Sequence, residues 1–477
     1  MVPQNPDRSG VSGPQEVCRL VSSKYTRSKV RKAMPSDFAY ILDELLHAQT
    51  DEDDNQHQYH ETILDTLLDI KNGNAFIIAL SALIKRLAVD RLHVVGDIFD
   101  RGPRADSILD MLMEHHSVDI EWGNHDILWM GAASGSLCCI AAVVRNCLAY
   151  NNMQILENGY GIPLRPLTLF AEKLYPDLTP EKAALQAVSI MMFKLEGQLI
   201  KRNPSFQMED RLLLERISPA QKTVEMDNYV WPIRDIALPT IDWADPYALT
   251  EEEQEVMDGL QDAFLHSLRL RAHVEFLYTR GRLYRRYNGN LLFHGCIPLD
   301  ENGEFLEKQL GNQTLSGKAL MDYADSMARK AYFTGRQDAL DFMWYLWCGD
   351  DSPVCGRKIK TFARFFIPDE ESWHEPRNPY YDYYNDEKVC EKMLAAFGLD
   401  SPQSRIVNGH TPIRVTHGES PIKAGGRLIV IDGGFCKAYQ KATGIPGYTL
   451  IANSHGMRIM SHHPFTTLED ALEANRD

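Results

Sequence analysis

Two glycine-bounded motifs, each placed at the end of a predicted strand, constrain the fold of this chain more than any other feature. Residues 96–102 read Gly-Asp-Ile-Phe-Asp-Arg-Gly after the apolar run 93–95, and residues 123–126 read Gly-Asn-His-Asp after the strand-like segment 118–122. Both preceding segments predict buried strands that end where the polar loops begin. Because ligands gather outside the carboxyl ends of strands in open α/β sheets, we expect the two loops to converge on one site.

The polar residues of these loops are those that metal-assisted phosphoester chemistry uses. Asp97 offers a carboxylate that can bridge two divalent cations roughly 3.5–4 Å apart, an arrangement that clamps a phosphoryl oxygen and acidifies a bound water. Asn124 adds a neutral oxygen ligand. His125 can protonate a leaving alkoxide if Asp100 orients its ring, and Arg101 presents a planar fork to phosphate oxygens. We therefore predict Asp97 and Asn124 as metal ligands, with catalytic roles for His125, Asp100 and Arg101.

Each of these residues also has a purely structural interpretation. Asp97 and Asp100 could cap loops, Arg101 could be a surface charge, and His125 could be a hydrogen-bonded turn residue. For the two motifs together, that interpretation requires the same coincidence at two strand ends, so the functional interpretation is favoured.

Two histidines further along the chain stand beside glycines at other predicted strand ends. His294 follows the segment 290–293, and His410 follows the segment 405–407. A single histidine of this kind is more often structural. In this chain order, however, both are predicted ligands for the cation of the first two loops. One carboxylate, one amide and two imidazoles suit Mn2+, with iron and zinc as alternatives.

Composition limits the class of protein. With 44% hydrophobic and 24% charged residues, the chain is globular and large enough for an α/β domain with insertions. It has no apolar run near the roughly 20 residues of a membrane span, and its polar start does not resemble a secretory signal. Nine cysteines without a C-x-x-C pair predict a reduced, cytoplasmic protein. The net charge of -16 argues against a nucleic-acid partner.

The order of predicted elements divides the chain into four ranges. Residues 1–16 are polar and rich in Pro and Gly, and are expected to be unstructured. Residues 17–166 and 286–477 contain the strand, loop and helix pattern around the motifs, whereas 167–285 consists mainly of amphipathic helical segments. We predict an α/β fold, with a β-sandwich flanked by helices and a mainly helical insertion.

These motifs resemble those of the calcineurin-like metallophosphoesterases, which share the order D-x-H, G-D-x-x-D-R-G, G-N-H-[DE], His-Gly and Gly-His. Within that superfamily the chain is similar to the class III (Firmicutes-type) fructose-1,6-bisphosphatases. The similarity runs from about Val17 to Pro464 and includes the segments 23–26, 94–103, 118–133, 293–298, 346–349, 378–381, 407–412 and 431–435. The resemblance implies the calcineurin-like β-sandwich and a binuclear Mn2+ site. It also implies hydrolysis of the sugar bisphosphate fructose 1,6-bisphosphate to fructose 6-phosphate in gluconeogenesis.

One part of the family pattern is missing. None of the sixteen histidines has an aspartate two residues before it, so the D-x-H motif of the first metal position is absent. We expect an N-terminally truncated member, in which one metal position is complete and the other retains only Asp97. The missing strand is expected to leave an unpaired edge beside the Asp97 strand, which favours a homo-oligomer.

Cationic side chains for the substrate phosphates are predicted at Arg101, Arg336, Arg357, Lys358 and Lys360, with Lys437 as a weaker candidate. Three functional hypotheses follow. The first is a fructose bisphosphatase impaired by truncation, and the second is a metallophosphoesterase of other specificity, such as a protein or nucleotide phosphatase. The third is a catalytically silent remnant that binds metal or metabolite without turnover.

Overall fold

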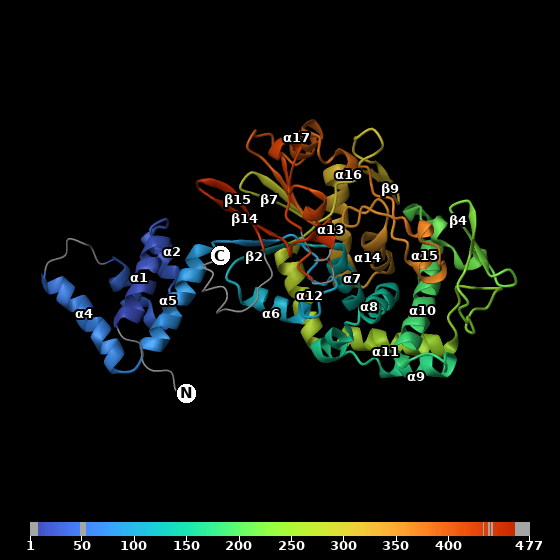
Figure 1. Cartoon of the computed structure of the whole chain (residues 1–477), viewed down its shortest axis with the longest axis horizontal. Helices are drawn as coiled ribbons and strands as arrows, with labels where there is room; N and C mark the ends of the chain where they lie inside the picture. The colour runs from blue at the N-terminus through green and yellow to red at the C-terminus, as the bar shows by residue number, and fades with distance from the viewer. Residues whose placement is uncertain (1–7, 48–53, 433, 437–438, 440–441, 463–477) are drawn as a thin grey trace. The chain divides into compact units, whose positions relative to one another are not determined.

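The computed structural model describes residues 8–47, 54–432, 434–436, 439 and 442–462 (Figure 1). The chain forms two compact units, which are Met1–Leu92 with His115–Val118, and His93–Glu114 with Asp119–Asp477. This division differs from the four expected ranges, because the helices before residue 92 have a core of their own. Both motifs, His294 and His410 belong to the second unit.

The first unit is helical in its described residues. Apolar side chains from its helices bury against one another in one cluster that includes Cys18, Leu42, Phe76 and Leu80. α1 packs mainly on α5. The helices are α1 (Arg8–Ser22), α2 (Arg27–Ala33), α3 (Ala39–His47), α4 (Asp54–Asp69) and α5 (Gly73–Ala88).

Helix α1 corrects one expectation. Residues 1–16 are expected to be unstructured, yet α1 begins at Arg8. Gln15 and Arg19 hydrogen bond to the Leu45 carbonyl at 3.1 and 2.7 Å, and Cys18 is fully buried. These tertiary contacts stabilise a helix that composition alone does not predict. Residues 1–7 lie outside the described part of the chain.

A three-stranded sheet carries the two motifs. Its order is β1-β2-β6, with β1 (Leu92–Val94) at one edge, and β2 (Val118–Glu121) pairs in parallel with β6 (Gly281–Arg282). The strands expected at 93–95 and 118–122 are thus present, each shifted or shortened by one residue. The first motif leads from β1 to α6 (Ala105–Glu114). The second motif differs from the expected loop, because α7 (Asn124–Ala133) already begins at its second residue.

A five-stranded mixed sheet carries the two later histidines. Its order is β12-β13-β11-β8-β7, and its three central strands are parallel, with Ile406 opposite both Leu291 and Leu428. The strand expected at 290–293 is confirmed as β8, and that expected at 405–407 is shifted by one residue. The strands are β7 (Tyr284–Tyr287), β8 (Asn290–Phe293), β11 (Ile406–Asn408), β12 (Ile422–Lys423) and β13 (Leu428–Val430).

The range 167–285 contains four helices and a small sheet. The long helical segments predicted there are each divided in two. Pro180 begins a second helix after the first ends at Leu174, and the Ser267 hydroxyl accepts the Leu270 N–H at a new helix start. The elements are α9 (Arg165–Leu174), α10 (Pro180–Arg202), α11 (Glu251–His266), α12 (Leu268–Arg280), β3 (Ile217–Ser218), β4 (Thr223–Met226) and β5 (Tyr229–Pro232). α10 packs on α8 (Leu137–Ala149) and α9 (Figure 1).

The remaining α-helices and strands belong to the second unit. α14 (Gln337–Cys348) packs on α7 and brings its last turn to the second motif. The others are α13 (Gly317–Thr334), α15 (Thr361–Phe366), α16 (Tyr380–Tyr383), α17 (Glu387–Ala396), β9 (Lys308–Leu310), β10 (Gln313–Leu315), β14 (Tyr448–Asn453) and β15 (Gly456–Ser461). The described residues therefore form a mixed α/β fold.

Among the described helices, none by itself has both the length and the apolar composition needed to cross a membrane. One bent pair, Gln58–Asp69 with Gly73–Ala88, meets the two criteria only when both helices are taken together.

Candidate metal and phosphate site

The side chain of Asp126 ties the two motif loops together. Its carboxylate accepts the backbone N–H groups of Gly123, Asp97 and Phe99 at 3.0, 2.8 and 3.2 Å. Burial raises the pKa of this carboxyl to about 6, and the nearby Asp97 carboxylate adds to the effect. In return, the His125 N–H donates to Oδ1 of Asp97 at 3.0 Å. Hydrogen bonds from backbone N–H groups to the carboxylates of Asp126 and Asp97 thus hold the two loops together.

Close approach at this point requires glycine at position 123. A Cβ atom there would lie 2.1 Å from Oδ1 of Asp97, closer than atoms can pack. Asp97 itself has a positive φ of 57°, an uncommon conformation for a residue with a side chain. Such strain persists only where surrounding contacts hold it, and it is concentrated at functional sites.

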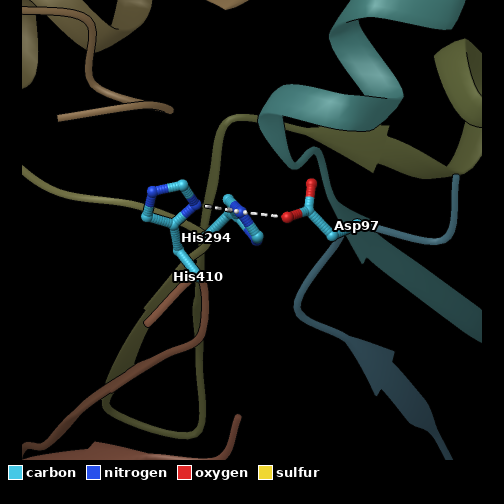
Figure 2. A group of neighbouring side chains, drawn as sticks. All are labelled: Asp97, His294 and His410. Atoms are coloured by element: carbon cyan, nitrogen blue, oxygen red, sulfur yellow. Dashed lines mark hydrogen bonds and ion pairs between the residues drawn. The ribbon is translucent and has the colours of Figure 1, made fainter. Parts of the chain in front are cut away.

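Asp97, His294 and His410 form one cluster, and His294 lies between the other two (Figure 2). Nε2 of His294 is 3.2 Å from Oδ2 of Asp97 and 3.1 Å from Nδ1 of His410. One ligand atom from each residue lies within 4.8 Å of the others. Nδ1 of His294 donates to the Val95 carbonyl at 2.6 Å, which directs Nε2 into the cluster. The strand ends after β1, β8 and β11 have therefore converged as predicted.

The Asp97 carboxylate stabilises positive charge within the cluster. Burial raises the pKa of Asp97, but His294 and His125 outweigh it and hold that pKa well below its usual range. Burial lowers the pKa of His294, but Asp97 outweighs it and raises the pKa to about 9. Burial also holds the pKa of His410 well below its usual range, so this ring is a neutral imidazole. Divalent transition metals bind an ionised carboxylate and neutral imidazoles, so a metal ion would take the place of the His294 proton.

Two orphaned polar atoms add to the fit. Oδ1 of Asn124 and Nε2 of His410 are buried and have no hydrogen-bond partner among the described residues. Leaving such a group unsatisfied typically costs about 1–3 kcal/mol. The Asn124 amide is held by its Nδ2, which donates to the Trp347 carbonyl at 3.5 Å. The residues predicted as ligands thus fit a divalent cation. Asp97, His294 and His410 form one group, and Asn124 directly precedes His125, whose N–H donates to Asp97.

His125 and Asp100 are in contact. Nε2 of His125 lies 3.2 Å from Oδ1 of Asp100, and the ring packs edge-on against Trp347, with 4.8 Å between centroids. The arrangement can hold a proton on His125 while Asp100 orients the ring.

The guanidinium of Arg101 stacks on two tyrosines rather than pairing tightly with a carboxylate. Its Cζ atom lies 4.4 Å from the ring centroid of Tyr150 and 4.7 Å from that of Tyr439. Nε of Arg101 is buried without a hydrogen-bond partner among the described residues, and Oδ1 of Asp100 is 3.9 Å away. A pocket lined by Asp100, Arg101, His125 and Tyr150 adjoins this group.

Among the other predicted phosphate-binding residues, Arg357 lies nearest the cluster. Its charge contributes to the lowered pKa of His410, and its buried Nε has no hydrogen-bond partner among the described residues. By contrast, Lys358 pairs with Asp210, and Nζ of Lys360 is 2.6 Å from Asp227. These two ammonium groups are therefore already neutralised.

Arg336 lies away from the site. It precedes α14 and pairs with Asp338 at 3.0 Å, whereas Trp347 at the other end of α14 contacts His125. At 1.5 Å per residue, the helix separates these ends by roughly 15 Å. The structure does not bring Arg336 together with the cluster. Lys437 lies outside the described residues.

Four residues of the site were not predicted. Trp347, Tyr150 and Tyr439 come from a helix end, a helix cap and a short segment near the C-terminal end of the described residues, where no periodic pattern marks them. Asp432 is different, because it follows β13 as His410 follows the neighbouring parallel strand, a signal that the sequence does contain. Its carboxylate accepts the Gly434 N–H at 2.9 Å, and burial raises its pKa to about 6.

The fold and the site together define an α/β protein with a candidate metal centre. Beside this centre lie His125, Asp100 and Arg101, and Nε of Arg101 has no hydrogen-bond partner among the described residues. Residues 11–477 match the family model described as Firmicute fructose-1,6-bisphosphatase. The chain belongs to this family.

Relatives with the same family name are similar over nearly the whole chain. The chain is 48% identical over 486 residues to the fructose-1,6-bisphosphatase class 3 of Clostridium botulinum (strain Langeland / NCTC 10281 / Type F), covering 97% of this chain and 73% of the relative. The enzyme of the same name from Clostridium novyi (strain NT) is 48% identical over 487 residues, with the same coverage. No solved structure matches the chain.

Proposed function

We propose that this protein hydrolyses fructose 1,6-bisphosphate to fructose 6-phosphate and phosphate, as a gluconeogenic enzyme of the cytoplasm. The observation that carries the proposal is the Asp97, His294 and His410 cluster beside the His125–Asp100 pair. Membership of the Firmicute fructose-1,6-bisphosphatase family supplies the substrate. We propose further that the two main sheets are the halves of a calcineurin-like sandwich.

The metal ligands in this proposal are Asp97, Asn124, His294 and His410, and the proposed metal is Mn2+. When bound, the cation would polarise the phosphoryl group and acidify a water nucleophile. The buried orphan atoms of Asn124 and His410 support their assignment.

The protein side chains then supply binding and proton transfer. Arg101 binds two phosphoryl oxygens with its in-plane N–H groups. His125 donates its proton to the leaving sugar oxygen as the P–O bond breaks, and Asp100 orients the ring for that transfer. Arg357 binds the second phosphate, since its charge acts on His410 and its buried Nε has no hydrogen-bond partner among the described residues.

Phosphate release with Mn2+ present tests the proposal. The substrate panel contains fructose 1,6-bisphosphate, other sugar bisphosphates, a phosphopeptide and nucleotides, and the matched control is His125→Ala. Preferred release from fructose 1,6-bisphosphate, lost in the variant, supports it. A preference for phosphopeptide or nucleotide indicates a phosphoesterase of other specificity. Metal binding without turnover on any substrate indicates a silent protein, and either result overturns the proposal.

A further inference from the structure

Arg101 contacts two aromatic rings that come from distant parts of the chain. Tyr150 caps the end of α8, where its N–H donates to the Asn146 carbonyl at 3.0 Å. Tyr439 comes from a segment nearly 300 residues later in the chain. Both rings lie within 4.7 Å of the Arg101 Cζ atom. Both rings are close enough for a cation–π contact with the guanidinium.

Tyr439 is itself anchored in place. Its N–H donates to the Cys436 carbonyl at 3.0 Å, and its carbonyl accepts the Thr443 hydroxyl at 3.2 Å. Gly434, with a φ of 74°, packs so closely that a Cβ there would lie 2.5 Å from Cβ of Tyr439. The ring beside Arg101 therefore has a defined position.

Stacking leaves the hydrogen-bonding edge of an arginine open. The five N–H donors of a guanidinium lie in its plane, and a ring that contacts one of its faces leaves them free. A carboxylate that held Arg101 by a bidentate pair would occupy the same donors that a phosphate needs. Here the nearest carboxylate oxygen, on Asp100, is 3.9 Å from Nε, and Nε has no hydrogen-bond partner among the described residues.

We propose that Tyr150 and Tyr439 are positioning residues that fix the plane of Arg101, so that its fork receives a tetrahedral oxyanion such as the phosphoryl group of the substrate. The assignment of the oxyanion rests on the proposed function. The cation–π contacts take the place of a bidentate salt bridge. Such a salt bridge would use the same N–H donors that the phosphate needs.

Tyr439 has a second link to the machinery through its hydroxyl. Burial raises the pKa of this phenol well above its usual range, and the charge of Asp100 and a hydrogen bond to it act in the same direction. Because Asp100 contacts His125, Tyr439 lies against both the phosphate fork and the His125–Asp100 pair. Its ring and its hydroxyl therefore have separable effects.

Binding of inorganic phosphate to the Mn2+-loaded protein, measured by calorimetry, tests the positioning role without turnover. Tyr150→Leu removes one ring and should weaken phosphate binding roughly 3- to 10-fold, the range of a partly desolvated cation–π contact. Tyr150→Phe keeps the ring and should bind as the wild type does. Tyr229→Leu, at an exposed tyrosine of β5, is the matched control. Mn2+ binding should be unchanged in all three variants.

A double-mutant cycle separates positioning from general destabilisation. Arg101→Lys retains the charge but not the planar fork, so phosphate binding is weakened. Adding Tyr150→Leu to Arg101→Lys should weaken it by less than the same change does in the wild type. An equal loss in both backgrounds, or an unchanged affinity in Tyr150→Leu, overturns the proposal.

Tyr439→Phe separates the ring from the hydroxyl. Phosphate affinity should be retained, because the ring remains, while kcat falls with little change in KM, because Asp100 loses a partner. Tyr439→Leu should weaken phosphate binding as well. If no variant or wild type hydrolyses fructose 1,6-bisphosphate but the phosphate-binding pattern holds, the proposed function fails and the positioning role stands. Weakened phosphate binding in Tyr439→Phe would contradict the role of the ring.

Discussion

Nε2 of His125 lies 3.2 Å from Oδ1 of Asp100, and the two side chains are 18% and 19% exposed. In the proposed reaction, this carboxylate orients the imidazole that protonates the leaving group. Replacing His125 with Ala should lower hydrolysis roughly 10²- to 10⁴-fold, the usual effect of losing a general acid. Mn2+ content should be unchanged, because His125 is not one of the proposed ligands. Phosphate release and metal analysis on the same preparation measure both effects.

His417→Ala, at an exposed histidine, is the matched control for that experiment and should retain activity. A loss of metal in His125→Ala as complete as in a ligand variant would show that the role assigned to His125 is wrong.

Replacing His410 or Asn124 with Ala should lower the amount of Mn2+ that remains after dialysis. Both residues offer a buried atom with no hydrogen-bond partner among the described residues, so their removal deletes a donor that nothing else replaces. Activity should fall with the metal content and recover in part at high Mn2+ concentration. Asn302→Ala, at an exposed turn, is the control for the amide. Full metal retention in Asn124→Ala would remove this residue from the ligand set.

The two arginines predicted as phosphate ligands are expected to differ. Arg357→Ala should raise the KM for fructose 1,6-bisphosphate roughly 10- to 100-fold, because a hydrogen bond to a charged group contributes about 1.5–3 kcal/mol. Arg336→Ala should leave the KM unchanged, because Arg336 pairs with Asp338 at the far end of α14. Initial rates over a range of substrate concentrations measure the difference. Equal effects of the two changes would contradict the placement of Arg357.

The sequence predicted that His294 and His410 lie together because both follow short apolar strands, and parallel strands of one sheet end at the same edge. Asp97 follows β1 of the other sheet, so its meeting with the histidines depends on how the two sheets pack. The same rule applies to Asp432, which follows β13, but a lone aspartate before two glycines was not recognised as a site residue.

The remaining features depend on packing that no local pattern records. Tyr150 and Tyr439 meet at Arg101 only because a helix end and a distant segment of the chain come together. The position of Arg336 could not be predicted for a related reason. The packing of α14 decides which end of that helix lies at the site, and Arg336 precedes the other end. Likewise, the amphipathic pattern of the segments before residue 92 predicts that each helix buries one face. The pattern does not reveal that these helices pack on one another in a core of their own.

Glu121 gives the stability of the protein a defined pH dependence. Burial raises the pKa of this carboxyl to about 8, with Arg285 opposing the shift. The folded state therefore retains a proton that the unfolded state releases at lower pH. The free energy of unfolding is therefore higher in acid, where Glu121 is protonated in both states, and it falls as the pH rises toward about 8. Glu121→Gln cannot ionise, so its Tm relative to the wild type should increase between about pH 5 and pH 8.

Thermal unfolding at several pH values measures this difference, with Glu225→Gln as the control at an exposed position of β4. A difference that stays constant or shrinks as the pH rises would contradict the buried, protonated state of Glu121.

Metal stoichiometry is the sharpest expectation for the chain as it stands. Among the described residues, one group of carboxylate and histidine side chains has its ligand atoms within 4.8 Å of one another, and the sequence contains no D-x-H motif. A second cation would share Asp97 and otherwise be held by water, which binds Mn2+ too weakly for retention. We therefore expect about one Mn2+ per chain. We also expect hydrolysis slower than in a relative that has D-x-H, because a single metal lacks the two-metal clamp.

Metal analysis after dialysis, beside phosphate release at millimolar Mn2+, measures both quantities. A relative that contains the D-x-H motif is the control and should retain two ions under the same conditions. Two tightly held ions with rapid turnover in this chain would show that other side chains complete the second position. Asp432 would then be the first residue to replace, because its carboxylate is buried close enough to Asp97 and Asp100 for their charges to act on its pKa.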